Sequence, residues 1–365
     1  MPHNVLITGG SGYLGGTLLN RLPAAKILPL ENVYASVRDE SQAENVRKYG
    51  FKPLSFDFGD AAAITAAVVD NKITVVYFLT DPVTHQAQVT FIKALAQVKE
   101  QTGQDVHFLH TSGAKMFSSH TGSPTDRPLL DTEPDLYDIH KGLRPGPDFF
   151  KQAVATNCIV IEEAEKLGVR SYVFVPCIVY GKGEGFGNKI SIQTVCIVKA
   201  AKAVGRVYKV DDGKPSWPVC HVIDNTNLYI DLLRKIVANE NPSHGKNGFY
   251  LAASGSIVWD DLYSALGEGL AKRKVISDPT VTGADDKALG KLAVEFGCPP
   301  EMVAVQIGGL CTFTAENGKR LGWKPRFPPE HILEYADEEV EAILEHLESW
   351  EERSVKAGRL PPKKK

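Results

Sequence analysis

The first half of the chain alternates between short apolar runs and segments whose apolar residues recur every three or four positions. Short β-branched runs are typical of buried strands, and the longer spacing is typical of amphipathic helices. The pattern predicts strands at 5–7, 32–37, 52–56, 74–79, 106–110 and 171–175. It predicts helices at 13–21, 42–49, 61–70, 84–102 and 149–167. Strands that alternate with crossover helices favour an α/β fold with a Rossmann-type, doubly wound parallel sheet.

Beyond Gly181 the pattern becomes mostly helical. Helices are predicted at 190–204, 225–239 and 330–352, and strands at 219–223 and 248–252. We interpret the last, acidic helix as a solvated capping helix, because its heptad pattern is too irregular for a coiled coil. We therefore expect two units and a tail. The first domain is 1–186 with a return segment at about 219–252, the smaller C-terminal substrate lobe is 187–218 and 253–350, and the tail is 351–365.

A glycine-rich turn joins the first strand to the first helix. Gly10, Gly12 and Gly15 satisfy the spacing G-x-G-x-x-G. Glycines allow the backbone to approach a pyrophosphate, and a helix N-terminus presents free N–H groups with a positive dipole end. An ordinary tight turn is the alternative, but the position between a strand and a helix favours a dinucleotide site. The first domain is therefore predicted to bind NAD or NADP.

Several motifs share an order with one protein superfamily. Thr8 and Gly9, with Gly12 and Gly15, give T-G-x-x-G-x-x-G. Later segments resemble R-P-x-x-V-Y-G, V-H-V-D-D-L, W-x-E-L and L-G-W-x-P, at residues 173–181, 220–225, 259–262 and 320–325. The chain thus resembles the extended short-chain dehydrogenase/reductase superfamily over most of residues 1–330, and it looks most similar to NAD(P)-dependent epimerase/dehydratase-like proteins of fungal type.

Arg38 and Asp39 follow the second strand, where an enzyme of this fold selects its cofactor. A guanidinium at this place can pair with the 2′-phosphate of NADP and stack on adenine. The alternative is that Asp39 binds the ribose hydroxyls of NAD. We favour NADP, with NAD as the alternative. The resemblance implies further cofactor contacts at Thr8, Gly9, Gly12, Tyr13, Leu14, Gly15, Asp57, Phe58, Leu79 and Pro176.

The resemblance also implies a catalytic serine, tyrosine and lysine. The tyrosine hydroxyl donates or accepts the proton, and a lysine four residues later lowers its pKa from about 10. Ser112, after the fifth strand, stands where the family places its serine. Tyr137 and Lys141 have the Y-x-x-x-K spacing.

Gly142, Pro145 and Pro147 follow this pair directly and interrupt any helix. Either an insertion has displaced Tyr137 and Lys141 while keeping them at the site, or the chain is an atypical member. In the second case another group, such as Lys151 or Tyr180, supplies the polar contact. His110, His140 and His221 are candidate acids, but we expect structural roles for them.

Composition narrows the function further. A net charge of −3 argues against a nucleic-acid partner, and the apolar runs are too short to span a bilayer. The six cysteines form no C-x-x-C pair, which argues against disulfides and a metal site and favours a reducing compartment. No room for a signal peptide precedes the first strand.

We therefore expect a cytoplasmic NADP-dependent oxidoreductase, either a monomer or a homodimer. Its substrate is a small organic carbonyl or alcohol, such as a secondary metabolite. One alternative is an epimerase or dehydratase with no net redox change. The other is a regulator that binds NADP without catalysis.

Overall fold

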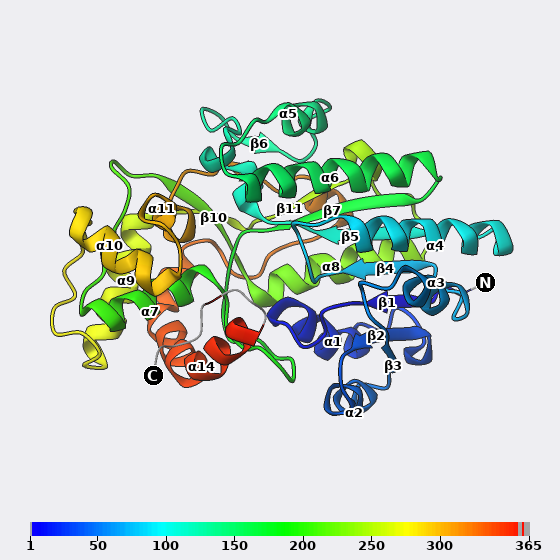
Figure 1. Ribbon diagram of the computed structural model, residues 1–365, viewed down its shortest axis with the longest axis horizontal. Coiled ribbons are helices and arrows are strands. Elements are labelled where there is room, and N and C mark those ends of the chain that lie inside the picture. Colours follow the sequence, from blue (N-terminus) through cyan, green and yellow to red (C-terminus); the bar gives the residue numbers. More distant parts are fainter. Residues whose placement is uncertain (1, 357–359, 361–365) are drawn as a thin grey trace.

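The computed structural model describes residues 2–356 and 360, and a seven-stranded parallel sheet forms its centre (Figure 1). The strands lie in the order β11-β7-β5-β4-β1-β2-β3. Their bounds are β1 (Val5–Ile7), β2 (Val33–Val37), β3 (Lys52–Ser55), β4 (Val75–Phe78), β5 (His107–Thr111), β7 (Arg170–Pro176) and β11 (Phe249–Ala252). The Rossmann-type α/β fold class predicted from the sequence is therefore confirmed.

Helices cover both faces of this sheet, as the alternation of its side chains requires. Leu6, Val76 and Phe108 pack on one face against α3 (Ala61–Val69), α4 (Gln86–Thr102) and α6 (Asp148–Lys166). Ile7 and Tyr77 pack on the other face, against α1 (Tyr13–Ala25) and α8 (Val222–Val237). The helix α2 (Glu40–Lys48) lies between β2 and β3 in the chain. Continuous burial on both faces explains why the strands are apolar runs rather than alternating ones.

The carboxyl ends of all seven strands meet at one edge, because every pairing in this sheet is parallel. From the end of β7 the chain continues into β8 (Ile178–Tyr180), which pairs with β10 (Ser216–His221), and β10 pairs in turn with β12 (Gly255–Val258). This small sheet leads into the second lobe. The carboxyl edge of the large sheet therefore faces that lobe.

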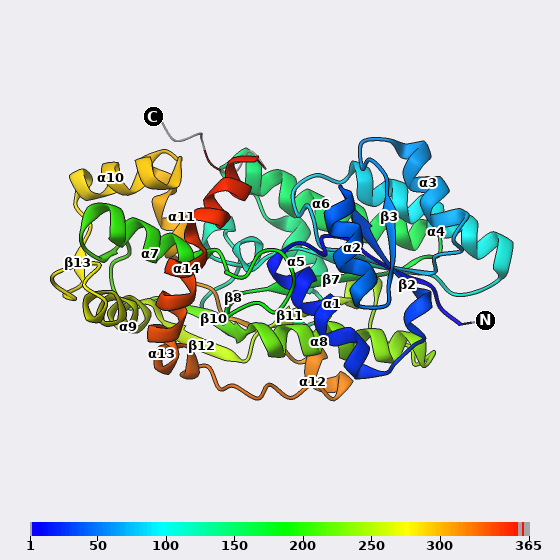
Figure 2. The same cartoon turned by 90° about the horizontal axis from the view of Figure 1, so that it is seen from below.

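The lobe beyond β8 is mainly helical and lies toward the left in Figures 1 and 2. Its helices are α7 (Gln193–Val204), α9 (Trp259–Lys272), α10 (Asp286–Phe296), α11 (Val303–Ile307), α13 (His331–Glu334) and α14 (Ala336–Lys356), and α12 (Asn317–Leu321) lies against α8 and β11. Two short pairs complete the strands: β9 (Tyr208–Lys209) with β13 (Thr282–Gly283), and β6 (Leu129–Leu130) with β14 (Phe313–Thr314). Single 3₁₀ turns occur at η1 (Leu30–Asn32), η2 (Ala114–Phe117), η3 (Ser119–Thr121), η4 (Gly245–Asn247) and η5 (Pro300–Met302). No helix in the described part of the chain is long and apolar enough to cross a membrane.

The chain returns from β10 to the large sheet through α8 and β11, as the predicted return segment requires. One boundary differs from the prediction. Val222 and Ile223 begin α8 rather than end a strand, because the N–H of Ile223 donates to Nδ1 of His221, which caps the helix. The limits assigned to the two domains stay a prediction.

Two other segments differ from the sequence pattern. The stretch 118–147, where the pattern predicts neither a helix nor a strand, contains β6 and the helix α5 (Leu136–Gly142). The predicted helix 330–352 is divided at Tyr335, which ends α13 before α14 begins. Of the predicted tail, residues 351–356 continue α14, and 357–359 and 361–365 lie outside the described residues.

Candidate functional site

The glycine turn after β1 is held tightly against the end of β4. Thr8 accepts a hydrogen bond at its Oγ1 from the N–H of Leu79 (2.9 Å), and Gly12 donates to the carbonyl of Gly9 (2.8 Å). Gly9 has a φ of +72°, which favours glycine, and a Cβ on it would lie 3.1 Å from the Leu79 carbonyl oxygen. A Cβ on Gly15 would overlap the Gly9 carbonyl oxygen. The turn therefore requires glycine for its own close packing.

The first turn of α1 receives no side-chain cap from its N-cap residue, Gly12. The first N–H groups of an α-helix have no partner within the helix, and they carry its positive dipole end. Leu14 is half-buried beside Tyr13 in a small apolar cluster with Val179 and Ile223. This is the local structure that holds a pyrophosphate.

A second glycine-rich segment, residues 181–189, packs against the start of α1, and we call it the glycine strap. The Tyr13 hydroxyl donates to the Gly181 carbonyl (2.6 Å), and the N–H of Asn188 donates to the Ser11 carbonyl (2.9 Å). A Cβ on Gly187 would overlap that same Ser11 oxygen. The glycines alternate along the strap, a sequence signal that could have predicted its close approach to α1 but was missed.

Charged groups hold the strap at two points. Glu184 accepts two hydrogen bonds from the guanidinium of Arg21, at 2.7 and 2.8 Å. The N–H of Gly181 donates to Oε2 of the buried Glu339 in α14 (2.8 Å), whose Oε1 accepts from the Thr194 hydroxyl (2.8 Å). Burial raises the pKa of the Glu339 carboxyl, and these two donors oppose that rise. The strap thus joins both lobes beside the glycine turn.

Arg38 and Asp39 take different roles at the end of β2. Asp39 caps α2, because its Oδ1 accepts from the N–H of Gln42 (2.9 Å). Arg38 is exposed, and its N–H donates to Oε1 of Gln42 (3.2 Å). Its guanidinium has no ion-pair partner among residues 2–356. Asp39 is therefore occupied, whereas the Arg38 guanidinium is available.

The remaining predicted cofactor residues also lie at the carboxyl edge. Asp57 follows β3, is exposed and accepts from the N–H of Gly59 (2.9 Å), so it caps its own turn. Phe58 is half-buried, and its ring lies 5.8 Å from that of Phe78. Pro176 is the last residue of β7. The parallel sheet places these residues at the same edge as the glycine turn.

Ser112 lies at that edge too, directly after β5. Its N–H donates to the Phe174 carbonyl (2.8 Å), which fixes the backbone beside β7. Its side chain is 6% exposed, and its Oγ has no hydrogen-bond partner in the described structure. A buried hydroxyl without a partner is costly unless a ligand or water satisfies it. Ser112 therefore has the position that a carbonyl-binding group needs, and its hydroxyl is free to form a hydrogen bond.

Tyr137 and Lys141 lie elsewhere. Both contact Oε1 of Glu162 in α6, the Tyr137 hydroxyl at 2.5 Å and the Lys141 Nζ at 2.6 Å. Burial and the bond to Glu162 raise the pKa of Tyr137, which is opposite to the shift that a catalytic phenolate needs. The Glu162 bond likewise raises the pKa of Lys141.

Tyr137 and Lys141 lie nearer to the other edge of the sheet, where the parallel strands begin. The Nζ of Lys246 lies 5.1 Å from the centre of the Tyr137 ring, and Lys246 belongs to η4, just before the start of β11. Asp148 is the first residue of α6, and Glu162 follows it by 14 residues. At about 1.5 Å per residue, Glu162 lies about 21 Å along the helix from its start. The structure therefore does not bring Tyr137 and Lys141 to Ser112. The cause is the break after α5: the chain leaves that helix at Gly142 and starts a new one after Pro147.

The other candidate groups have partners of their own. Lys151 is exposed and pairs with Asp148 at 3.0 Å. The Tyr180 hydroxyl is 3.0 Å from Nδ1 of His331. Burial lowers the pKa of three further candidates, to about 4 for His110, about 3 for His140 and about 4 for His221. They are neutral at pH 7. The described residues contain no group of three or more His, Cys, Asp or Glu side chains suited to a metal ion.

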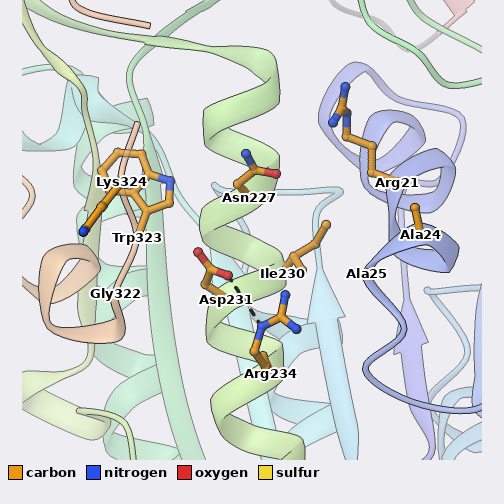
Figure 3. A pocket seen from close by; sticks show the side chains of 10 residues that line it. All are labelled: Arg21, Ala24, Ala25, Asn227, Ile230, Asp231, Arg234, Gly322, Trp323 and Lys324. Carbon is orange, nitrogen blue, oxygen red and sulfur yellow. Dashed lines mark ion pairs between the residues drawn. The ribbon is translucent and has the colours of Figure 1, made fainter. Parts of the chain in front are cut away.

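Two cavities lie away from the glycine turn. The first, of about 440 Å³, lies between α8 and the C-terminal end of α1, and Figure 3 shows Arg21, Asn227, Asp231, Arg234 and Lys324 around it. The second, of about 400 Å³, lies on the outer surface of α6, and Lys141, Lys151 and Glu162 are among its lining residues. Neither cavity includes Ser112 or a residue of the glycine turn.

Comparison with known proteins agrees with this geometry. The model of the NAD dependent epimerase/dehydratase family matches residues 5–245. A curated protein, oxidase ucsJ of Acremonium sp, is 22% identical over an alignment of 360 residues that covers 90% of this chain and 94% of that protein. The fungal type expected from the sequence stays a prediction.

Solved structures show the same fold at low identity. PbgP3 protein of Burkholderia pseudomallei has a TM-score of 0.64 at 14% identity, covering 94% of this chain and 98% of that one. A dTDP-glucose 4,6-dehydratase of Bacillus anthracis, solved with NAD, has a TM-score of 0.62 at 12% identity, covering 96% and 99%. A UDP-glucose 4-epimerase of Thermotoga maritima has 0.61 at 15% identity, covering 94% and 99%. These structures show the Rossmann-type fold, and the family model confirms the resemblance to NAD(P)-dependent epimerase/dehydratase proteins.

Proposed function

Because this chain belongs to the NAD dependent epimerase/dehydratase family, we propose that it is an oxidoreductase that uses NADP. It reduces the ketone of a small organic molecule, or oxidises the corresponding alcohol. The observation that carries this proposal is the buried Ser112 hydroxyl, which has no partner and follows β5 at the edge that also carries the glycine turn.

The residues at the glycine turn fit a dinucleotide. Gly15 has no room for a side chain, a Cβ on Gly12 would lie 3.1 Å from the Gly9 carbonyl oxygen, and the start of α1 offers its free N–H groups to the pyrophosphate. Arg38 supports NADP rather than NAD, because its guanidinium is free while Asp39 caps α2. When bound, the cofactor supplies or accepts the hydride.

Ser112 orients the substrate and polarises its carbonyl. Its Oγ donates a hydrogen bond to the carbonyl oxygen, which gains negative charge as the ketone is reduced, and water supplies the proton that completes the alcohol. The backbone bond from Ser112 to Phe174 keeps this hydroxyl in place. Between Thr111 and Phe117 there is no carboxylate, so this turn lacks the acid–base group that a dehydration step adds to hydride transfer.

One observation favours a second candidate, a protein that binds NADP without catalysis. The tyrosine and lysine that the resemblance implies are not at the carboxyl edge. A nucleotide site that lacks its usual proton donor suits a sensor as well as an atypical enzyme.

Binding and turnover measured together distinguish these candidates. Titration calorimetry with NADPH and NADH is expected to give an affinity about 10- to 150-fold higher for NADPH, from the charge-assisted bonds of Arg38. A panel of small ketones is then followed by absorbance at 340 nm and by product analysis. Consumption of NADPH supports the oxidoreductase.

Two outcomes overturn the proposed oxidoreductase activity. Formation of an isomer or a dehydrated product without net change at 340 nm identifies an epimerase or dehydratase. Tight NADPH binding with no product across the panel identifies the sensor.

A further inference from the structure

Lys115 lies three residues after Ser112, in the single turn η2, and its side chain reaches into the lobe. Its Nζ donates to Oε1 of Gln306 in α11 (3.3 Å). The thiols of Cys196 in α7 and of Cys298 lie close enough to raise the pKa of this ammonium group. The ammonium group therefore lies between the Ser112 turn and the lobe that faces the carboxyl edge.

This ammonium group has no acidic partner within the described part of the chain. Its one hydrogen-bond acceptor there is the neutral Gln306 amide. Burial lowers the pKa of Lys115, and among the neighbouring side chains only neutral thiols oppose that shift. By contrast, Lys199 of α7 has Glu295 at 3.9 Å. A partly buried cation without a counter-charge is unfavourable for the free protein and favourable for an incoming anion.

The backbone around Lys115 is fixed by bonds across the two lobes. Its carbonyl accepts from the Ser118 hydroxyl (2.8 Å), and the N–H of Ser119 donates to the Leu310 carbonyl (2.8 Å). The Cys311 thiol lies 3.3 Å from the Phe117 carbonyl oxygen. The backbone that carries the ammonium group is thus fixed, as a binding group requires.

We propose that Lys115 binds a carboxylate of the substrate, so that the enzyme acts on oxo acids or hydroxy acids. Ser112 and Lys115 then bind two oxygens of one molecule: the hydroxyl binds the reacting carbonyl, and the ammonium binds the acid group. The inference rests on the proposed function, and it adds the substrate class. A charge-assisted bond of this kind separates an acid from its neutral ester.

Matched pairs of acid and ester test the inference. Suitable pairs are 2-oxobutanoate, 3-oxobutanoate and 4-oxopentanoate with their methyl esters, because they vary the spacing between the carbonyl and the carboxylate. For one spacing we expect kcat/KM of wild type to be about 10- to 150-fold higher for the acid. In Lys115→Met this ratio falls to about 1, while the rate with the ester stays within about threefold. In Lys115→Arg part of the preference returns.

Lys202→Met is the matched control, since Lys202 is an exposed lysine of α7. It is expected to keep the wild-type ratio. Equal rates with acid and ester in wild type overturn the inference and leave the proposed oxidoreductase intact. Failure to bind NADPH, in contrast, contradicts the proposed function itself.

A measurement without turnover decides the case in which no pair reacts. Acetic anhydride labels lysines, and peptide mass spectrometry follows Lys115 alone. With NADP present, the acid of the right spacing is expected to slow labelling of Lys115 at least about fivefold, and its ester is not, because a bound carboxylate holds the amine protonated and covered. Labelling unaffected by all three acids overturns the inference.

Discussion

At the carboxyl edge of the sheet, Thr8, Arg38 and Ser112 come from three different strand ends, spread over the first third of the chain. On the outer surface of α6, Tyr137 and Lys141 come from one helix of seven residues. The sequence pattern assigns chemistry to both regions. The fold assembles the first group at one edge and turns the second toward Glu162.

The difference lies in what positions each residue. Residues that follow the strands of a parallel sheet reach the same edge whatever the length of the connecting segments. The Y-x-x-x-K spacing fixes only how two side chains lie relative to each other on a helix. The place of that helix depends on its neighbours, and here Gly142 and Pro147 separate α5 from α6. Five substitutions test this contrast.

Gly12→Val is expected to have the largest effect. Its side chain occupies the space of the pyrophosphate, so NADPH affinity falls at least about 10³-fold, the result of losing several charged hydrogen bonds together. Calorimetry measures the loss, and circular dichroism verifies folding. Gly142→Ala is the control in α5, because a Cβ there meets nothing within 4 Å. Wild-type affinity in a folded Gly12→Val protein would move the site away from the turn.

Ser112→Ala comes next. Loss of the hydroxyl that binds the developing oxyanion is expected to lower kcat by about 10²–10³ and to leave NADPH affinity unchanged. Steady-state rates with a ketone substrate measure it, and the exposed Ser41→Ala serves as the control. A rate within threefold of wild type contradicts the role of Ser112.

Arg38→Ala has a smaller and selective effect. NADPH binding is expected to weaken about 10- to 150-fold and NADH binding to change little, because only NADP carries the 2′-phosphate. Arg47→Ala, in the neighbouring helix α2, is the control. If both cofactors weaken equally, Arg38 does not read the phosphate, and NAD becomes the favoured cofactor.

Tyr137→Phe and Lys141→Met are expected to change kcat/KM by less than about threefold. Tyr137→Phe removes the bond of a buried hydroxyl to Glu162, so the free energy of unfolding falls by about 0.5–1.5 kcal/mol, measured by urea denaturation. Lys141→Met removes an exposed ion pair and is expected to lower it less. A loss of 10²–10⁴ in turnover, the usual contribution of a general acid, would restore the pair to the catalytic site.

Most of the nucleotide-binding unit could be predicted from the sequence, because its strands are buried on both faces and its turn is local. The prediction was wrong where tertiary contacts set the end of a helix or strand. His221 ends β10 early by capping α8, and Tyr335 divides the C-terminal helix. Neither event has a glycine or proline signal.

The candidate site divides in the same way. Thr8, Gly12 and Ser112 could be placed by their positions after strands. The freedom of Arg38 depends on which side chain caps α2, and a sequence leaves both options open. The isolation of Lys115 was hidden too, because it depends on which residues of the lobe surround the ammonium group. Absence of a counter-charge is a property of the folded molecule.

The bond between Gly181 and Glu339 has a consequence for the order in which the protein becomes competent during synthesis. These residues are 158 positions apart in the chain. N-terminal units generally fold first on the ribosome. The glycine turn and α1 therefore form long before the carboxylate that anchors the glycine strap has been made. A nascent chain passes through a stage in which the glycine turn is exposed. A cofactor that binds early would meet this turn before the glycine strap is in place.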